Sequence, residues 1–145
     1  MSNSVYKMQR SLQRFNRDLE KVRKRYPTRM SDIQKKLVLE ALKRIVERTP
    51  VDTGRARGNW QVTIGTPANG KLDALDKDGQ ATIEKGIAVL SGLPPYQIVF
   101  LSNNLEYIEI LEEGNSQQAP NGMVRLTVLE LEGNIRQILH FPHWK

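Results

Sequence analysis

Cysteine is absent from this chain of 145 residues, which excludes disulfide bonds, thiol catalysis and thiolate metal sites. No apolar run approaches 18 residues, and the opening "MSNSVYKMQR" has no signal-peptide core, so we expect neither a membrane span nor secretion. We therefore expect synthesis in the cytoplasm and no membrane partner. The length suits one domain, residues 1–145, which is large enough to bury a core without disulfide bonds or a structural metal ion.

Groups for catalysis and metal binding are scarce. The two histidines, His140 and His143, stand among the last six residues, and a metal ion would need a third ligand from elsewhere. No phosphate-binding G-x-x-x-x-G-K-[ST] loop occurs. Asp76 and Asp78 follow the order of a calcium loop, but the twelfth position is Lys85, where a bidentate glutamate is required. We expect no enzyme, no cofactor and no bound metal.

Charge is abundant and unevenly divided along the chain. Residues 1–48 hold fourteen Lys/Arg against five Asp/Glu, whereas residues 49–145 hold eight against eleven. The two parts therefore stand at +9 and −3 within a net charge of +6. A basic half is typical of nucleic-acid binding, of stacking between partners of opposite charge, or of a solvated helix face.

Residues 1–28 are predicted to form a basic N-terminal helix that ends at Pro27. A narrow apolar stripe runs down one side of it: Val5, Met8, Leu12, Phe15, Leu19, Val22 and Tyr26. The other faces carry Lys7, Arg10, Arg14, Arg17, Lys21, Arg23 and Lys24. Such a helix can bury only one seam, so we expect it outside the body or against a neighbouring subunit.

A second helix is predicted to open at Ser31, because Gln34 follows at the spacing of a capping box. It should end at Arg48 or Thr49, since the residue before Pro50 is pushed out of the α region. Its apolar stripe is broad enough for a core helix: Ile33, Leu37, Val38, Ala41, Leu42, Ile45 and Val46.

The stretch "TPVDTGRARGNW", residues 49–60, indicates a sharp corner. Pro50 blocks helix continuation, Asp52 can accept backbone N–H groups in an Asx-turn, and Gly54 can take a positive φ. A half-buried strand should follow, because Trp60, Val62 and Ile64 alternate with polar residues. The corner does not account for Arg55 and Arg57, which come directly after the glycine.

This stretch resembles the "TPVDTGRLRxSW" signature of the phage head–tail connector proteins of the HK97 gp10-like family, which includes tail completion and neck proteins. A second segment, "YIEILEEGNSQQAPNGMV" at residues 107–124, is similar to the family's "YAxxLExGxSxQAPxGM". Ala56 stands where the family usually has leucine, and Asn59 where it often has serine. The resemblance covers roughly residues 30–130, and two motifs in order are more specific than either alone.

The resemblance implies an α+β protein that forms a ring, usually hexameric, at the head–tail junction of a long-tailed phage. N-terminal helices would pack on a small, mainly antiparallel β-sheet with further short helices. The ring would join the tail to the head connector or adaptor, contact tail terminator or tail-tube proteins, and pass DNA through its lumen without specific binding. Localisation would be the virion neck or upper tail, and no enzyme activity is implied.

The resemblance also implies roles for residues. Pro50, Asp52 and Gly54 would shape the corner, while Arg55 and Arg57 would face a neighbouring chain or the acidic segment at residues 106–113, or remain solvated. Interface candidates are the arginines of the corner, the cations of the first helix and the acidic segment: Arg55, Arg57, Arg14, Arg17, Lys21, Glu106, Glu109, Glu112 and Glu113.

The remaining elements follow from local pattern. A loop at residues 65–79 should lead to a helix that buries Ala81, Ile83, Ile87 and Leu90. Residues 96–101 are apolar on both faces and should form a strand inside the sheet. Residues 105–113 should form a short acidic helix. Residues 123–139 fit a helix or a strand, and Gly133 would interrupt either, but the helix is favoured. The core then spans residues 29–139, and the tail at 140–145 docks on a neighbour or stays disordered.

Three alternatives to a tail completion protein stay open. A tail terminator or a head-closure protein also forms a small ring, which places similar requirements on the sequence of its subunit. A non-specific nucleic-acid-binding protein would use the basic helices, but the aromatic residues are not interleaved with the arginines as in base-stacking platforms.

Overall fold

The computed structural model describes residues 9–10, 13–14, 16–18, 20–21, 24 and 27–139. The described residues before 27 are helical and exposed. The chain then forms α2 (Pro27–Arg48), α3 (Arg55–Gly58), β1 (Gln61–Ile64), α4 (Gln80–Ser91), β2 (Val99–Ser102), α5 (Ile108–Glu112) and α6 (Val124–Leu139). This is the α+β class expected from the sequence. None of the helices in these described ranges is long and apolar enough to cross a membrane.

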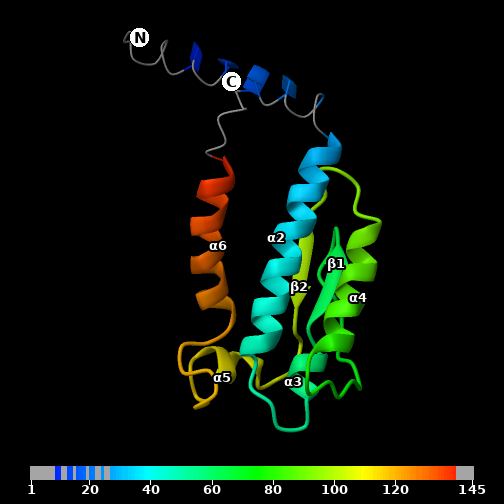
Figure 1. Cartoon of the computed structure of the whole chain (residues 1–145), viewed down its shortest axis with the longest axis vertical. Coiled ribbons are helices and arrows are strands. Elements are labelled where there is room, and N and C mark those ends of the chain that lie inside the picture. The colour runs from blue at the N-terminus through cyan, green and yellow to red at the C-terminus, as the bar shows by residue number, and fades with distance from the viewer. Residues whose placement is uncertain are drawn as a thin grey trace.

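Helix α2 stands at the centre of the fold. Figure 1 shows α4 and α6 on opposite sides of it, with α3 and α5 at the end where α2 stops. Its 3.6-residue period buries Leu42, Ile45 and Val46, as the sequence predicted. These side chains join β1 and α4 in one core, whose buried members are Leu42, Ile45, Val46, Trp60, Val62, Ile83, Leu90, Leu93, Ala119 and Met123.

The start of α2 differs from the prediction. The helix begins at Pro27, four residues before Ser31, because proline needs no N–H partner in the first turn and its φ suits a helix. Ser31 therefore lies inside the helix, and its buried hydroxyl has no hydrogen-bond partner in the described part of the chain. Gln34 donates to the carbonyl of Gln97 at 2.6 Å, so the predicted capping box is wrong.

The sheet has two antiparallel strands within the described residues, with Gln61 opposite Ser102 and Ile64 opposite Val99. A two-stranded ribbon is marginal alone, and here α4 packs on β1 and on α2. The alternation at residues 60–64 is confirmed. The predicted strand at residues 96–101 is confirmed only over Val99–Ser102, because Tyr96 has a φ of +62°, outside the β region. The expectation that this strand lies inside the sheet is wrong, because the described sheet has two strands and β2 is half-buried.

Helix α4 buries a face one residue away from the predicted one. Ile83 and Leu90 are buried as expected, but Ala81 and Ile87 are exposed. Gly86 is buried instead, because the Leu42 side chain of α2 packs so close to it that a Cβ there would overlap Leu42. The close approach of the two helices therefore sets the rotation of α4, which apolar spacing alone does not reveal.

The two helices predicted at residues 105–113 and 123–139 are both present, but their bounds differ from the predicted ones. Helix α5 is shorter than residues 105–113, and α6 is a helix that continues through Gly133. The one-turn helix α3 was not predicted. The apolar stripe proposed for the first helix, its end at Pro27 and the tail at 140–145 rest on residues outside the described ranges.

Candidate functional site

The corner after α2 is anchored by a buried threonine. Thr49 is fully buried; its hydroxyl donates to the Ile45 carbonyl at 2.6 Å and accepts the Trp60 indole N–H at 2.8 Å. The two ends of the stretch at residues 49–60 are therefore tied together. Buried polar groups of this kind are costly unless bonded, so the pair fixes the angle between α2 and β1.

Gly54 lies at the turn of this corner. Its φ is +89°, which confirms the predicted left-handed conformation. Its carbonyl accepts the N–H of Gly58 at 2.9 Å and of Asp76 at 3.0 Å. A Cβ at this position would lie 2.6 Å from the Lys77 nitrogen, so the backbone of the loop at residues 65–79 approaches where only glycine fits.

Asp52 does not form the predicted Asx-turn. Its carboxylate is exposed and has no hydrogen bond within the described residues. The Thr53 hydroxyl accepts the Arg55 N–H at 3.3 Å instead, next to the start of α3. The corner therefore holds its shape without the Asp52 side chain, which leaves that carboxylate available to another group.

Arg57 binds its own chain with three donors. Nε donates to the backbone carbonyl of Thr49 at 2.9 Å, Nη1 to that of Lys77 at 2.8 Å and Nη2 to that of Glu47 at 2.9 Å. The planar guanidinium thus joins the end of α2, the corner and the following loop. Arg55 is exposed, and no ion pair links either arginine to the acidic segment in the described part of the chain. Their roles toward a neighbouring chain stay predictions.

Asn59 fastens the loop that follows β1, and sequence reasoning missed it. The amide is fully buried; Oδ1 accepts the Leu72 N–H at 2.8 Å, and Nδ2 donates to the carbonyls of Arg55 at 2.8 Å and Leu72 at 3.0 Å. Its place beside Trp60, at the entry to an alternating strand, was the available signal. The partner at Leu72 was not readable from local pattern.

The carboxylates of the apparent calcium loop are used to begin α4. Asp76 accepts the N–H of Gly79 at 3.1 Å and of Thr82 at 2.8 Å, and the Thr82 hydroxyl at 2.6 Å. Asp78 accepts the N–H of Gln80 at 3.0 Å. Burial raises the pKa of Asp76, but the bonds from Thr82 and Gly79 outweigh it and leave that pKa below its usual value.

The second signature segment meets the first through Gln118. Its Oε1 accepts the Val51 N–H at 2.8 Å, and its Nε2 donates to the Val51 carbonyl at 3.2 Å. The two residues are 67 positions apart, yet the side-chain amide pairs with backbone as a strand would. Gly114, at φ +88°, allows the Pro120 carbonyl to approach so closely that a Cβ would overlap it.

Glu112 has a role that its neighbours on α5 do not share. Its two oxygens accept the N–H groups of Met123, Val124 and Arg125, each at 2.9 Å, and so cap the N-terminus of α6. Burial raises the pKa of Glu112, but these bonds and the charge of Arg125 together lower it by more. The pKa of Glu112 is therefore below its usual value.

The other acidic candidates lie on the surface. Glu106 pairs with Lys71, while Glu109 and Glu113 are exposed and have no ion-pair partner among the described residues. Helix α6 is also fastened to α2, because Glu130 pairs with Arg48 and, at 2.7 Å, with Arg44. The hydrogen bond from Arg48 contributes most to lowering the pKa of Glu130.

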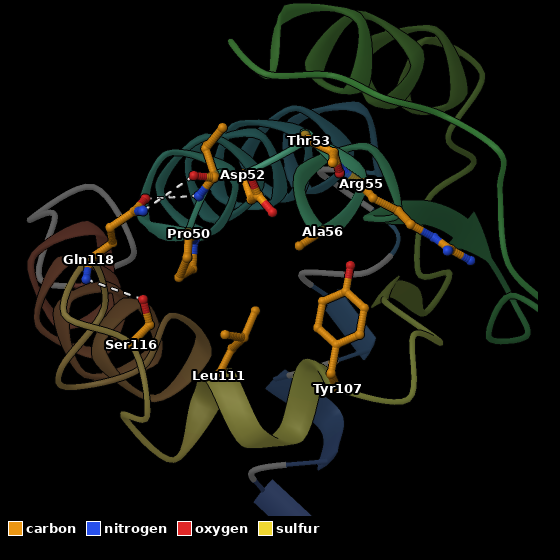
Figure 2. A pocket seen from close by; sticks show the side chains of 11 residues that line it. Pro50, Asp52, Thr53, Arg55, Ala56, Tyr107, Leu111, Ser116 and Gln118 are labelled. Carbon is orange, nitrogen blue, oxygen red and sulfur yellow. Dashed lines mark hydrogen bonds between the residues drawn. The ribbon is translucent and has the colours of Figure 1, made fainter.

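A hollow of about 270 Å³ opens between the two signature segments. Figure 2 shows Pro50 and Asp52 on the corner, with Tyr107 and Leu111 facing them from α5 and the residue before it. Gln118 lies at one side, where its bonds to Val51 hold the corner against the second segment. The arrangement places one carboxylate and one phenol in a mainly polar hollow, to which Pro50 and Leu111 add apolar surface.

The described residues include no group of three or more His, Cys, Asp or Glu side chains that could hold a metal ion. The interface candidates Arg14, Arg17 and Lys21 are exposed on the helical segment before α2. The structure brings the corner and the second segment together, but it does not bring these cations to them (Figure 1). Comparison with families of known proteins, with curated proteins and with solved structures yields no match for this chain.

Proposed function

We propose that the chain is a structural protein of a long-tailed phage, a ring subunit at the head–tail junction that acts as a tail completion or neck protein. The ring joins the tail to the head connector and leaves a channel for DNA. The observation that carries the proposal is the pairing of Gln118 with Val51, which joins the two segments on which the resemblance rests.

The residues of these segments support an assembly role more than a reaction. Thr49, Arg57 and Trp60 donate or accept hydrogen bonds that fix the corner, and Gly54 allows the loop to approach. Glu112 begins α6 from the second segment. A signature whose members hold the backbone in one shape suits a subunit that must present fixed surfaces to its neighbours.

Removal of the gene from the phage genome tests this function. We expect DNA-filled heads and complete tails that fail to join, with joining restored when the protein is supplied in trans. The variant Glu84→Gln, at an exposed position on α4, serves as the control and should restore joining like the wild type.

The same experiment separates the alternatives within the neck. Tails of uncontrolled length would indicate a tail terminator, and heads that lose their DNA would indicate a head-closure protein. Normal, infectious particles formed without the protein would contradict a neck role.

A further inference from the structure

The hollow between the corner and α5 contains two polar groups without partners. Asp52 and Tyr107 both line it, and Figure 2 shows the Asp52 carboxylate and the Tyr107 hydroxyl directed toward its interior. Neither side chain forms a hydrogen bond within the described ranges. Arg55 also lines the hollow, but Figure 2 shows its side chain extending away from Asp52 and Tyr107, so the Asp52 carboxylate is the charged group directed toward the interior.

The size and walls of the hollow favour one long cationic side chain. Its volume of about 270 Å³ lies just below the roughly 300–1,000 Å³ typical of small-molecule sites. Pro50 and Leu111 offer apolar surface to an aliphatic stem, the Tyr107 ring can contact a cation, and the Asp52 carboxylate can pair with it. An anionic occupant would meet the Asp52 charge.

The chain carries a matching set of cations on one helix face. Arg10, Arg14, Arg17, Lys21 and Lys24 follow one another at spacings of four, three, four and three residues, which places them within an arc of about 80° on an α-helix. All five side chains are exposed, and none has an ion pair within the described residues. Cations gathered in this way repel one another and favour an acidic partner.

One chain does not bring its own cations to its own hollow. These cations precede the N-terminal end of α2, whereas the hollow lies beyond its C-terminal end, and the 22 residues of α2 span roughly 30 Å. Figure 1 shows the two regions at opposite ends of the molecule. A contact between unlike ends of two copies is heterologous, and a heterologous contact closes into a ring when its rotation permits.

We propose that this hollow is a socket for an arginine or lysine side chain from the face Arg10–Lys24 of a second copy of the chain. The inference deepens the proposed ring and rests on it. Asp52 supplies the counter-charge, and Tyr107 with Leu111 supplies the surface for the stem.

Sedimentation velocity of the purified full-length chain at low salt, over increasing concentration, tests the socket. One variant reverses the socket, Asp52→Arg, and another reverses the face, with Arg14→Glu, Arg17→Glu and Lys21→Glu together. Matched controls are Asp73→Arg and the double variant Lys36→Glu with Lys85→Glu, all at exposed positions that do not line the hollow. Circular dichroism confirms that each variant is folded.

We expect each reversal to raise the dissociation constant of self-association about tenfold or more, with both controls unchanged. A mixture of the socket and face variants should associate again, because each then meets a complementary partner. Association that survives both reversals overturns the socket and leaves the ring standing.

Two further results overturn the inference. One is a wild-type chain that stays monomeric at every concentration; if it still joins heads to tails, the proposed function stands without the socket. The other is sub-micromolar binding of duplex DNA that the triple reversal abolishes while self-association is untouched, which assigns the cationic face to nucleic acid.

Discussion

Replacement of Gly54 by alanine tests two constraints on the corner at once. A residue with a Cβ loses about 1–2 kcal/mol in the left-handed region, and Gly54 has a φ of +89°. The added Cβ would also lie 2.6 Å from the Lys77 nitrogen and 2.7 Å from the Asp76 carbonyl carbon. Backbone atoms cannot rotate away as a flexible side chain can, and overpacking adds about 1–3 kcal/mol. Gly54→Ala should therefore lower the free energy of unfolding by about 2–5 kcal/mol.

Gly65 provides the matched control. Its φ is +87°, nearly that of Gly54, but no heavy atom lies within 4 Å of the position of its Cβ. Gly65→Ala should therefore show only the conformational loss of about 1–2 kcal/mol. The difference between the two variants isolates the close approach of the loop to the corner.

Urea denaturation followed by circular dichroism measures both variants, with thermal melts as a second readout. A loss of 1 kcal/mol should lower Tm by roughly 3 °C in a chain of this length. Equal losses for the two alanine variants would refute the packing of the loop against Gly54. An unchanged stability for both would refute the conformational argument as well.

Three further predictions concern Arg57 and Glu112. Arg57→Lys should lower the free energy of unfolding by about 1–3 kcal/mol, because an ammonium cannot replace a planar group bonded to three carbonyls; Arg55→Lys, at an exposed position, should change it little, and equal effects in denaturation would contradict this. Glu112→Ala should cost about 0.5–2 kcal/mol through loss of the α6 cap, and unchanged stability would refute the cap. Since the pKa of Glu112 is lowered by folding, the stability gap between wild type and Glu112→Gln should be full above the unfolded pKa of about 4.3 and shrink as the pH falls through the folded pKa; a gap independent of pH would contradict the sign.

Features set by local pattern were predicted well from the sequence. The buried face of α2 around Leu42 and Val46 follows from helical spacing, and the strand after Trp60 follows from alternation. The left-handed Gly54 follows from its place in a turn after a proline. Each of these depends on residues within a few positions along the chain.

Features set by distant contacts were not predicted. Gly86 faces α2 because Leu42 fills the space where a Cβ would lie, and Glu112 caps a helix that begins twelve residues later. The socket residue Tyr107 and the Gln118 bonds to Val51 also depend on how the second segment folds back on the corner. No periodicity within one element carries this information, although both residues stand in the segment that resembles the family.

The position of the protein in the particle is the most direct test of the proposed function. A three-dimensional image of the assembled phage, at a resolution that separates subunits, should show copies of this fold as a ring between the head connector and the tail. The end of α2 and α5 of one copy should lie against the basic helical face of the next. Particles whose head–tail junction contains no density for this fold would contradict the account.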